Sequence, residues 1–156
     1  MSSKMGKDYI NHRDNFGLTA VVAAVIRGRS GLVKRLLMAG AEIDEDVLML
    51  ALKSQSPMSE EARSTIVKDL LSYGADVNYQ DDSDGFTVLM ECLCMKRFEL
   101  VKVFLDAGAD LSIVDKRGNT ALILAIASRC PENIVNYLIE GRTNNNRNKR
   151  PRTEAS

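Results

Sequence analysis

The chain has 156 residues, of which 45% are hydrophobic and 27% are charged, and its 21 basic and 21 acidic side chains give a formal net charge of zero. This length suits one domain or one short array, and no apolar run is long enough to span a membrane. The charge balance disfavours a body that coats nucleic acid. The N-terminal sequence lacks the apolar core of a secretory signal, so we expect the three cysteines to be reduced thiols in the cytoplasm, the nucleus or both.

Valine recurs at equal steps of 34 residues, at positions 33, 67, 101 and 135. Each valine belongs to a block with apolar pairs at i, i+1, i+4 and i+5, a spacing that predicts a helix with one wide apolar stripe. Four copies at a fixed period predict a stacked array of helical units, which is typical of a binding surface for another protein.

A shorter apolar segment led by threonine precedes three of these blocks, and a Gly-Ala pair follows three of them. The threonines expected to cap the shorter helices are Thr19, Thr87 and Thr120. The glycines expected to terminate the longer helices are Gly40, Gly74 and Gly108. Each unit is therefore predicted to be a turn, a short helix, a reverse turn, a longer helix and a glycine stop.

This order of elements resembles the ankyrin repeat over roughly residues 9–141. The resemblance implies an all-α fold, an ankyrin-repeat solenoid with short β-turn fingers. The tetratricopeptide repeat shares the period of 34, but it has neither the Gly-x-Thr turn nor the Gly-Ala-Asp stop. The expected segments are an N-terminal stub resembling the end of a preceding repeat (1–13), repeat 1 (14–46), repeat 2 (47–80), repeat 3 (81–114), repeat 4 (115–142) and a disordered basic tail (143–156).

Two departures from the family pattern are visible. Repeat 2 has no finger, because Asp46 leads directly into the apolar run from Val47, and it has an extended loop before a helix that Ser59 is expected to cap. The family's turn histidine, which ties neighbouring turns together, is replaced by an apolar residue in every copy: Val22, Met90 and Ile123.

No catalytic, metal or cofactor site is expected. His12 is the single histidine, and the sequence has no glycine-rich phosphate loop. Cys92 and Cys94, two positions apart on a predicted helix, point to different sides and do not chelate one metal. The acidic run 81–84 lacks the closing glutamate of a calcium loop and coincides with the expected turn.

The resemblance implies that a partner binds to a concave face of turn tips and first helices. Phe16 and Phe86 are the sharpest candidates, because an aromatic residue at a turn tip either anchors a partner or folds back onto the next turn. The residues expected on this face are Asn15, Phe16, Leu18, Ile26, Arg27, Ser83, Asp84, Phe86, Cys94, Met95, Lys116, Arg117, Asn119, Ala127 and Ser128.

The C-terminal segment 142–156 has five basic residues and one acidic residue. Its cluster Lys149, Arg150, Pro151 and Arg152 resembles a short nuclear import signal, and the alternative is a solubilising end. Separately, Leu70 followed by Asp76-Val77-Asn78 is similar to the sequence that asparaginyl hydroxylases recognise in ankyrin repeats. Asn78 would be the modified residue, and the alternative is that it stabilises its turn.

These features favour a non-enzymatic, monomeric adaptor, scaffold or inhibitor that binds protein partners, with no small-molecule substrate, cofactor or membrane. The first alternative is a regulator of transcription or chromatin proteins that its basic tail directs to the nucleus. The second is an enzyme or nucleic-acid binder with an unrecognised site.

Overall fold

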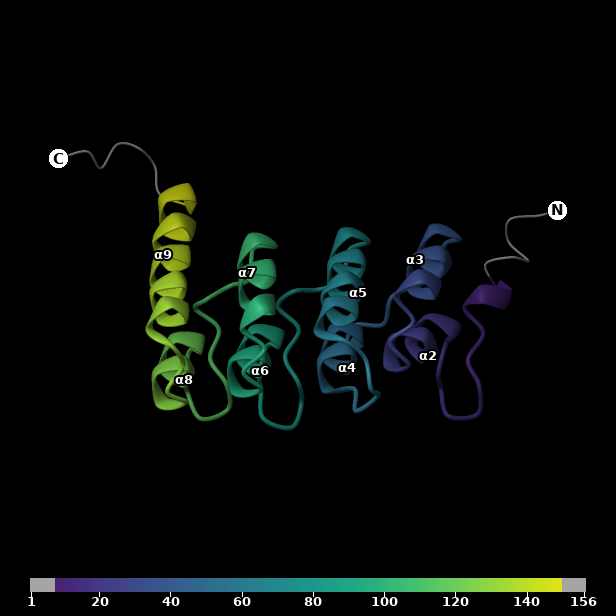
Figure 1. The fold of residues 1–156 in the computed structure, drawn as a ribbon, viewed down its shortest axis with the longest axis horizontal. Helices are drawn as coiled ribbons and strands as arrows, with labels where there is room; N and C mark the ends of the chain where they lie inside the picture. The colour runs from purple at the N-terminus through teal and green to yellow at the C-terminus, as the bar shows by residue number, and fades with distance from the viewer. Residues whose placement is uncertain (1–7, 150–156) are drawn as a thin grey trace. The chain divides into compact units, whose positions relative to one another are not determined.

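The computed structural model describes residues 8–149 and contains, in that range, eight helices labelled α2 to α9 (Figure 1). A helical turn at residues 8–10 precedes them. The chain divides into two compact units, Met1–Tyr79 and Gln80–Ser156. In the described residues no strand forms, and the β-type pairing is an isolated antiparallel bridge between Gln80 and Thr87. This all-helical architecture confirms the predicted fold class.

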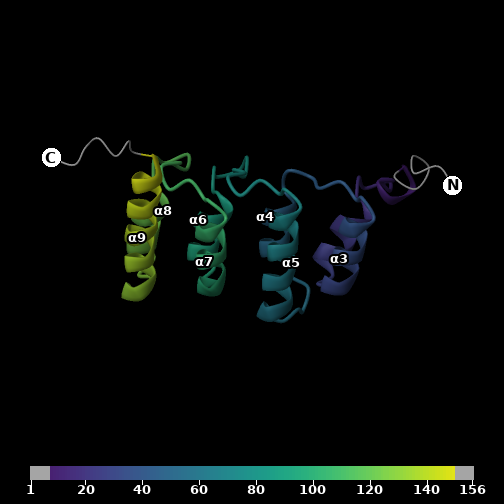
Figure 2. The same ribbon diagram turned by 90° about the horizontal axis from the view of Figure 1, so that it is seen from above.

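The first unit consists of two helix pairs, α2 (Ala20–Ile26) with α3 (Ser30–Met38) and α4 (Val47–Lys53) with α5 (Glu60–Ser72). The pairs pack side by side, α2 against α4 and α3 against α5 (Figure 1), and Figure 2 shows α3 beside α5 from above. Helix α4 begins one residue after Asp46, so repeat 2 has no finger, as the sequence predicts.

The second unit has the same arrangement. Its helix pairs are α6 (Val88–Cys94) with α7 (Phe98–Asp106) and α8 (Ala121–Ala127) with α9 (Glu132–Lys149). Helix α6 packs against α8, and α7 packs against α9. The fingers before α6 and α8 therefore belong to adjacent repeats of one compact unit.

The predicted helix caps are confirmed. The hydroxyl oxygens of Thr19, Thr87 and Thr120 each accept a hydrogen bond from the backbone N–H three residues later, at 3.2–3.3 Å. Ser59 caps α5 in the same way, accepting from the Ala62 N–H at 3.0 Å. These bonds satisfy backbone donors that the first helical turn leaves unpaired.

The glycine stops are confirmed as well. Gly40, Gly74 and Gly108 have φ of 96°, 96° and 89°, the left-handed region in which a side chain is strained. The alanine that follows each glycine donates to the carbonyl five residues earlier, at 3.0 Å, which closes the helix end.

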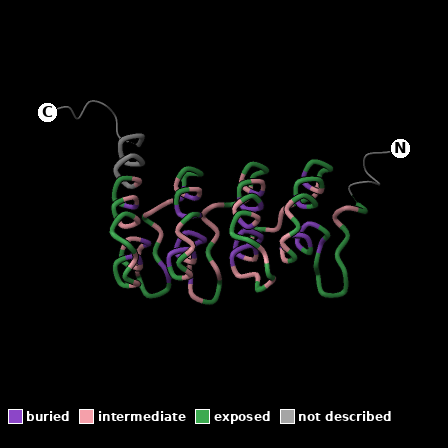
Figure 3. The backbone as a smooth tube through the Cα atoms, viewed as in Figure 1, coloured by how far each residue is buried: buried purple, intermediate pink, exposed green. Residues whose placement is uncertain are grey.

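The repeated apolar positions form the core. Val33, Val67 and Val101 are fully buried, whereas Val135 of the last repeat is half-buried. Figure 3 shows the buried positions along the packed sides of the helix pairs and the exposed positions along the finger of repeat 1. The small residue expected where first helices approach each other is buried in every copy: Ala24, Ala51, Cys92 and Ala125.

A buried arginine stabilises repeat 2, and the sequence pattern gave no indication of it. Arg63 is 3% exposed, and its Nη1 donates to the carbonyl of Ala51 at 2.6 Å, with a longer contact of 3.5 Å to that of Leu52. Its Nε also pairs with Glu60 at 3.2 Å. The guanidinium thereby satisfies carbonyls at the end of α4, where the extended loop leaves them without helical partners.

The last helix corrects one expected boundary. We expected ordered chain to end at residue 142, but α9 continues to Lys149. The segment contains no proline before Pro151, and a helix that has already formed extends at little cost through residues that permit it. The rest of the expected tail, residues 150–156, lies outside the described residues. None of the described helices is both long enough and apolar enough to cross a membrane.

Candidate functional site

An aspartate at the base of each finger organises its turn. In the finger of repeat 1, Asp14 Oδ1 accepts from the N–H groups of Phe16 and Leu18 at 2.8 and 2.9 Å. In the finger of repeat 4, Asp115 Oδ1 accepts from the N–H groups of Arg117 and Asn119, both at 2.8 Å. The carboxylate thus accepts hydrogen bonds from the backbone N–H groups of its own finger. These bonds fix the turn although the family's turn histidine is missing.

The finger of repeat 3 is one residue longer and uses two aspartates. Asp81 Oδ1 accepts from the N–H and hydroxyl of Ser83, at 2.8 and 2.7 Å. Asp84 Oδ1 accepts from the Phe86 N–H at 2.9 Å. The acidic run that resembles a calcium loop is therefore engaged in turn hydrogen bonds.

Direct hydrogen bonds join the fingers of repeats 3 and 4. The Lys116 N–H donates to the Asp84 carbonyl at 3.0 Å, and the Lys116 ammonium donates to the Asp82 carbonyl. Gln80 Nε2 bridges the carbonyls of Gly85 and Val114, at 2.9 and 3.0 Å. Because all of these bonds end on backbone carbonyls, one of them from a backbone N–H, the two fingers form a fixed pair.

A hollow of about 390 Å³ lies between these two fingers. It is lined by Ser83, Asp84, Phe86, Asp115, Lys116, Arg117, Asn119 and Leu124. Six of these residues are on the expected partner face, and the structure brings them together within the second unit. Asp115 and Leu124 were not predicted. The recurrence of aspartate at the base of each finger, at positions 14, 81 and 115, is the signal that would have found Asp115.

The charged side chains around the hollow differ in how far they are exposed to solvent. Asp115 is only 6% exposed. The Asn119 N–H, its side-chain amide and the Arg117 N–H hold the Asp115 pKa below its ordinary value. Lys116 and Arg117 are exposed, and the Arg117 guanidinium makes no hydrogen bond within the described part of the chain. The groups that face solvent therefore include a guanidinium free to bind a carboxylate.

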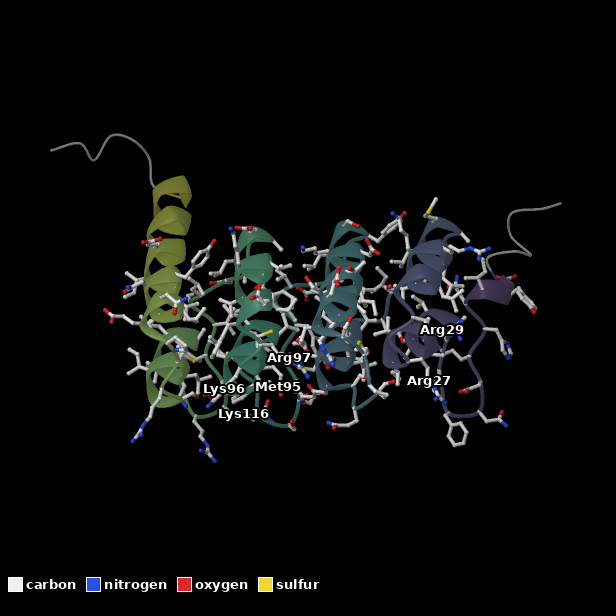
Figure 4. The ribbon with its side chains drawn as sticks, viewed as in Figure 1. Arg27, Arg29, Met95, Lys96, Arg97 and Lys116 are labelled. Atoms are coloured by element: carbon white, nitrogen blue, oxygen red, sulfur yellow. The ribbon has the colours of Figure 1, made fainter. Side chains whose placement is uncertain are left out.

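Three more of the expected residues, Cys94, Met95 and Ser128, lie on the first helices of this unit or just beyond them. Cys94 is exposed, as predicted, and its side chain is hydrogen-bonded to that of Ser128. Partial desolvation is the main cause of the raised pKa of the Cys94 thiol. Met95 is half-buried in the turn between α6 and α7, with Lys96 and Arg97 (Figure 4). A raised pKa keeps the Cys94 thiol protonated and therefore a weak nucleophile at neutral pH.

The other two cysteines do not form a reactive centre with Cys94. Cys92 is buried in the core, as predicted, and burial raises the pKa of Cys130. Among residues 8–141, no group of three histidine, cysteine or acidic side chains has the placement to hold a metal ion.

The expected residues of the first unit are not gathered into one hollow. Phe16 is 88% exposed at its finger tip, beside exposed Asn15. Leu18 is 37% exposed. Ile26 is half-buried at the end of α2, and Arg27 is exposed in the turn that follows (Figure 4). The two finger aromatics therefore differ, because Phe86 is half-buried in the hollow whereas Phe16 projects into solvent.

The remaining predicted sites are placed as follows. Asn78 is half-buried in the turn after α5, and its N–H donates to Asp76 at 2.9 Å. Ala127 is exposed at the end of α8. Lys149 is the last residue of α9, and Arg150, Pro151 and Arg152 lie outside the described residues.

Comparison with known proteins identifies the repeat. A family model described as ankyrin repeats, in three copies, matches residues 48–149. The Drosophila melanogaster neurogenic locus Notch protein is 30% identical over 123 residues, which are 79% of this chain and 4% of that protein. A putative ankyrin repeat protein of fowlpox virus is 31% identical over 107 residues, which are 69% of this chain and 25% of that protein.

A putative ankyrin repeat protein of Acanthamoeba polyphaga mimivirus is 30% identical over 140 residues, with 74% of this chain and 24% of that protein covered. This chain thus spans a quarter or less of the length of each of these relatives. Ankyrin repeats are generally non-catalytic modules of protein–protein interaction. The family match covers most of the chain, and the helix pairs, threonine caps and Gly-Ala stops agree with it: the chain belongs to the ankyrin repeat family.

Proposed function

We propose that the chain is a non-catalytic adaptor, scaffold or inhibitor that binds a protein partner through its finger tips and first helices. The hollow between the fingers of repeats 3 and 4 carries the proposal. It combines a half-buried aromatic ring, Phe86, with a free guanidinium, Arg117, on a pair of fingers fixed by hydrogen bonds. Aromatic and arginine side chains on a preorganised surface are typical binding hot spots.

Affinity capture would identify the partner and test the site. The chain is immobilised, bound proteins are identified by mass spectrometry, and the capture is repeated with Phe86→Ala and with Arg117→Ala. We expect both variants to lose the same partner, with dissociation constants raised roughly tenfold or more, as at a hot spot.

The matched control is Lys68→Ala, which removes an exposed basic side chain of α5, far along the sequence from both fingers. It should leave capture unchanged. Retention of every partner by the Phe86 and Arg117 variants, with both variants folded, contradicts a binding site in this hollow.

The second candidate is a nuclear regulator of transcription or chromatin proteins. The observation that favours it is the dense basic cluster Lys149, Arg150, Pro151 and Arg152, which suits the acidic groove of an import receptor. Residues 142–156 fused to a fluorescent reporter should concentrate it in the nucleus, and replacing the four residues by alanine should abolish this. A reporter that stays evenly distributed removes the support for this role.

Asn78 is proposed as a hydroxylation site on its resemblance to the sequence that asparaginyl hydroxylases recognise. Treatment with such an enzyme, its oxoacid co-substrate, ferrous iron and oxygen should add one oxygen to the peptide that contains Asn78. The Asn78→Ala variant is the control, and an unmodified native peptide under these conditions contradicts the proposal.

A further inference from the structure

The hollow between the fingers of repeats 3 and 4 contains apolar surface that is held in place. Phe86 and Leu124 line it, and both are half-buried. The backbone of Phe86 is fixed on both sides, because its N–H donates to Asp84 Oδ1 at 2.9 Å and its carbonyl accepts from the Asp81 N–H at 2.8 Å. The exposed part of the ring is therefore apolar surface that a partner side chain can cover without reordering the turn.

The acidic side chains of the lining already have hydrogen-bond donors. Asp115 is 6% exposed, and its carboxylate accepts from the Arg117 N–H at 2.8 Å and from the N–H and side-chain amide of Asn119, at 2.8 and 3.2 Å. Asp84 is half-buried and accepts from the Phe86 N–H. The negative charge of the lining is thus engaged in holding the two turns together.

The two basic side chains of the lining differ in what they contact. The Lys116 ammonium donates to the Asp82 carbonyl and so joins the fingers. Arg117 is exposed, and its guanidinium makes no hydrogen bond to the residues that the structure describes, although Asp115 fixes its backbone N–H. A guanidinium presents its N–H donors in a planar fork that matches the two oxygens of a carboxylate. The charge still available in the hollow is therefore positive.

We propose that the hollow binds a segment of a partner protein in which an acidic side chain lies close to a large apolar one. The carboxylate pairs with the Arg117 guanidinium, and the apolar side chain packs on Phe86 and Leu124. The volume of about 390 Å³ is near the lower end of the range for binding pockets, about 300–1,000 Å³, so it suits a few side chains of one segment. This inference rests on the proposed function, since it names the chemistry of the partner at that site.

A phage-displayed library of random peptides tests this chemistry before the partner is known. Selection on the immobilised native chain should enrich peptides that carry an aspartate or glutamate near a leucine, isoleucine or phenylalanine. Selection on Arg117→Glu should enrich a lysine or arginine in place of the acid, because the available charge is reversed. The control Arg35→Glu reverses an exposed charge on α3 and should enrich the same peptides as the native chain. Peptides without an acid, an unchanged selection on Arg117→Glu, or no enrichment at all overturns the proposal.

A synthetic copy of one enriched peptide tests whether its acid pairs with Arg117. Its dissociation constant is measured by fluorescence polarisation, with the acid present and with the corresponding amide in its place. The amide should bind the native chain roughly tenfold or more weakly, as expected for a lost hydrogen bond between charged groups. Against Arg117→Ala the same change should alter the dissociation constant by no more than about twofold. Equal losses against both chains would show that the acid contacts another residue.

The Phe86→Ala variant separates this inference from the proposed function. A peptide that binds Phe86→Ala as tightly as the native chain does not occupy the hollow, and the proposed binding site is then wrong. If Phe86→Ala weakens binding while the acid of the peptide is dispensable, the hollow remains the binding site, and only the acidic chemistry of the partner is wrong.

Discussion

The backbone N–H of Lys116 donates a 3.0 Å hydrogen bond to the carbonyl of Asp84, joining the fingers of repeats 3 and 4. This approach requires a residue without a side chain beside it. A Cβ at Gly85, where φ is 76°, would lie 2.9 Å from the Lys116 nitrogen. The geometry of the hollow between the fingers thus depends on a glycine that does not line it.

Gly85→Ala should therefore destabilise the second unit more than Gly118→Ala. Gly118 has a φ of 81° but open space around it, so alanine there costs roughly 1–2 kcal/mol of backbone strain. Alanine at Gly85 adds the clash with Lys116, a further cost of about 1–3 kcal/mol. Urea unfolding of both variants measures the difference, and equal losses would mean that the close approach of the fingers contributes nothing.

The stability of the chain should fall in acid in part through Asp115. Because hydrogen bonds lower its pKa in the folded protein, its contribution is present above the unfolded pKa of about 3.9 and is lost as pH falls through the lower folded value. The difference in unfolding free energy between the native chain and Asp115→Asn should shrink below about pH 4. Asp106→Asn, an exposed carboxylate on α7, is the control, and a pH-independent difference contradicts this role.

Removing Arg63 should destabilise the first unit. Arg63→Met fills similar space but leaves the carbonyls of Ala51 and Leu52 without their donor, which costs about 1–3 kcal/mol. Arg63→Lys should recover part of this loss because an ammonium still donates. Urea unfolding followed by circular dichroism provides the comparison. Full stability of the methionine variant would show that the guanidinium is dispensable.

The two finger aromatics should differ in stability. Phe16→Ala removes a ring that is 88% exposed and should change the unfolding free energy by no more than about 0.5 kcal/mol. Phe86→Ala removes a half-buried ring and should cost roughly 1 kcal/mol. Thermal unfolding of both variants checks the order, and a larger loss for Phe16→Ala is incompatible with the described packing.

Periodic features of the fold were predictable from sequence because local chemistry determines them. Threonines before apolar runs predicted the caps, and Gly-Ala pairs predicted the helix ends. The end of α9 was not predictable from composition, because asparagine-rich sequence is a poor helix former in isolation, yet α9 extends through it. Arg63 was missed because its partners are backbone carbonyls of another helix, and the pattern of apolar and polar residues does not depend on such contacts.

The candidate site was predicted in its residues but not in its assembly. The family resemblance selected Phe86, Lys116 and Arg117, and the structure places them around one hollow. The hydrogen bonds that fix this hollow, from Gln80 to the Val114 carbonyl and from the Lys116 N–H to the Asp84 carbonyl, join groups in different turns. Such contacts depend on the distance between neighbouring fingers, and a single sequence does not contain that distance.

Hydrogen–deuterium exchange of the chain, alone and saturated with its captured partner, tests the central claim most directly. If the hollow between the fingers of repeats 3 and 4 binds the partner, amides in residues 81–86 and 115–119 should exchange more slowly in the complex, and Lys68 and its neighbours on α5 should be unchanged. Protection that leaves both fingers unaffected and falls elsewhere in the chain would contradict it.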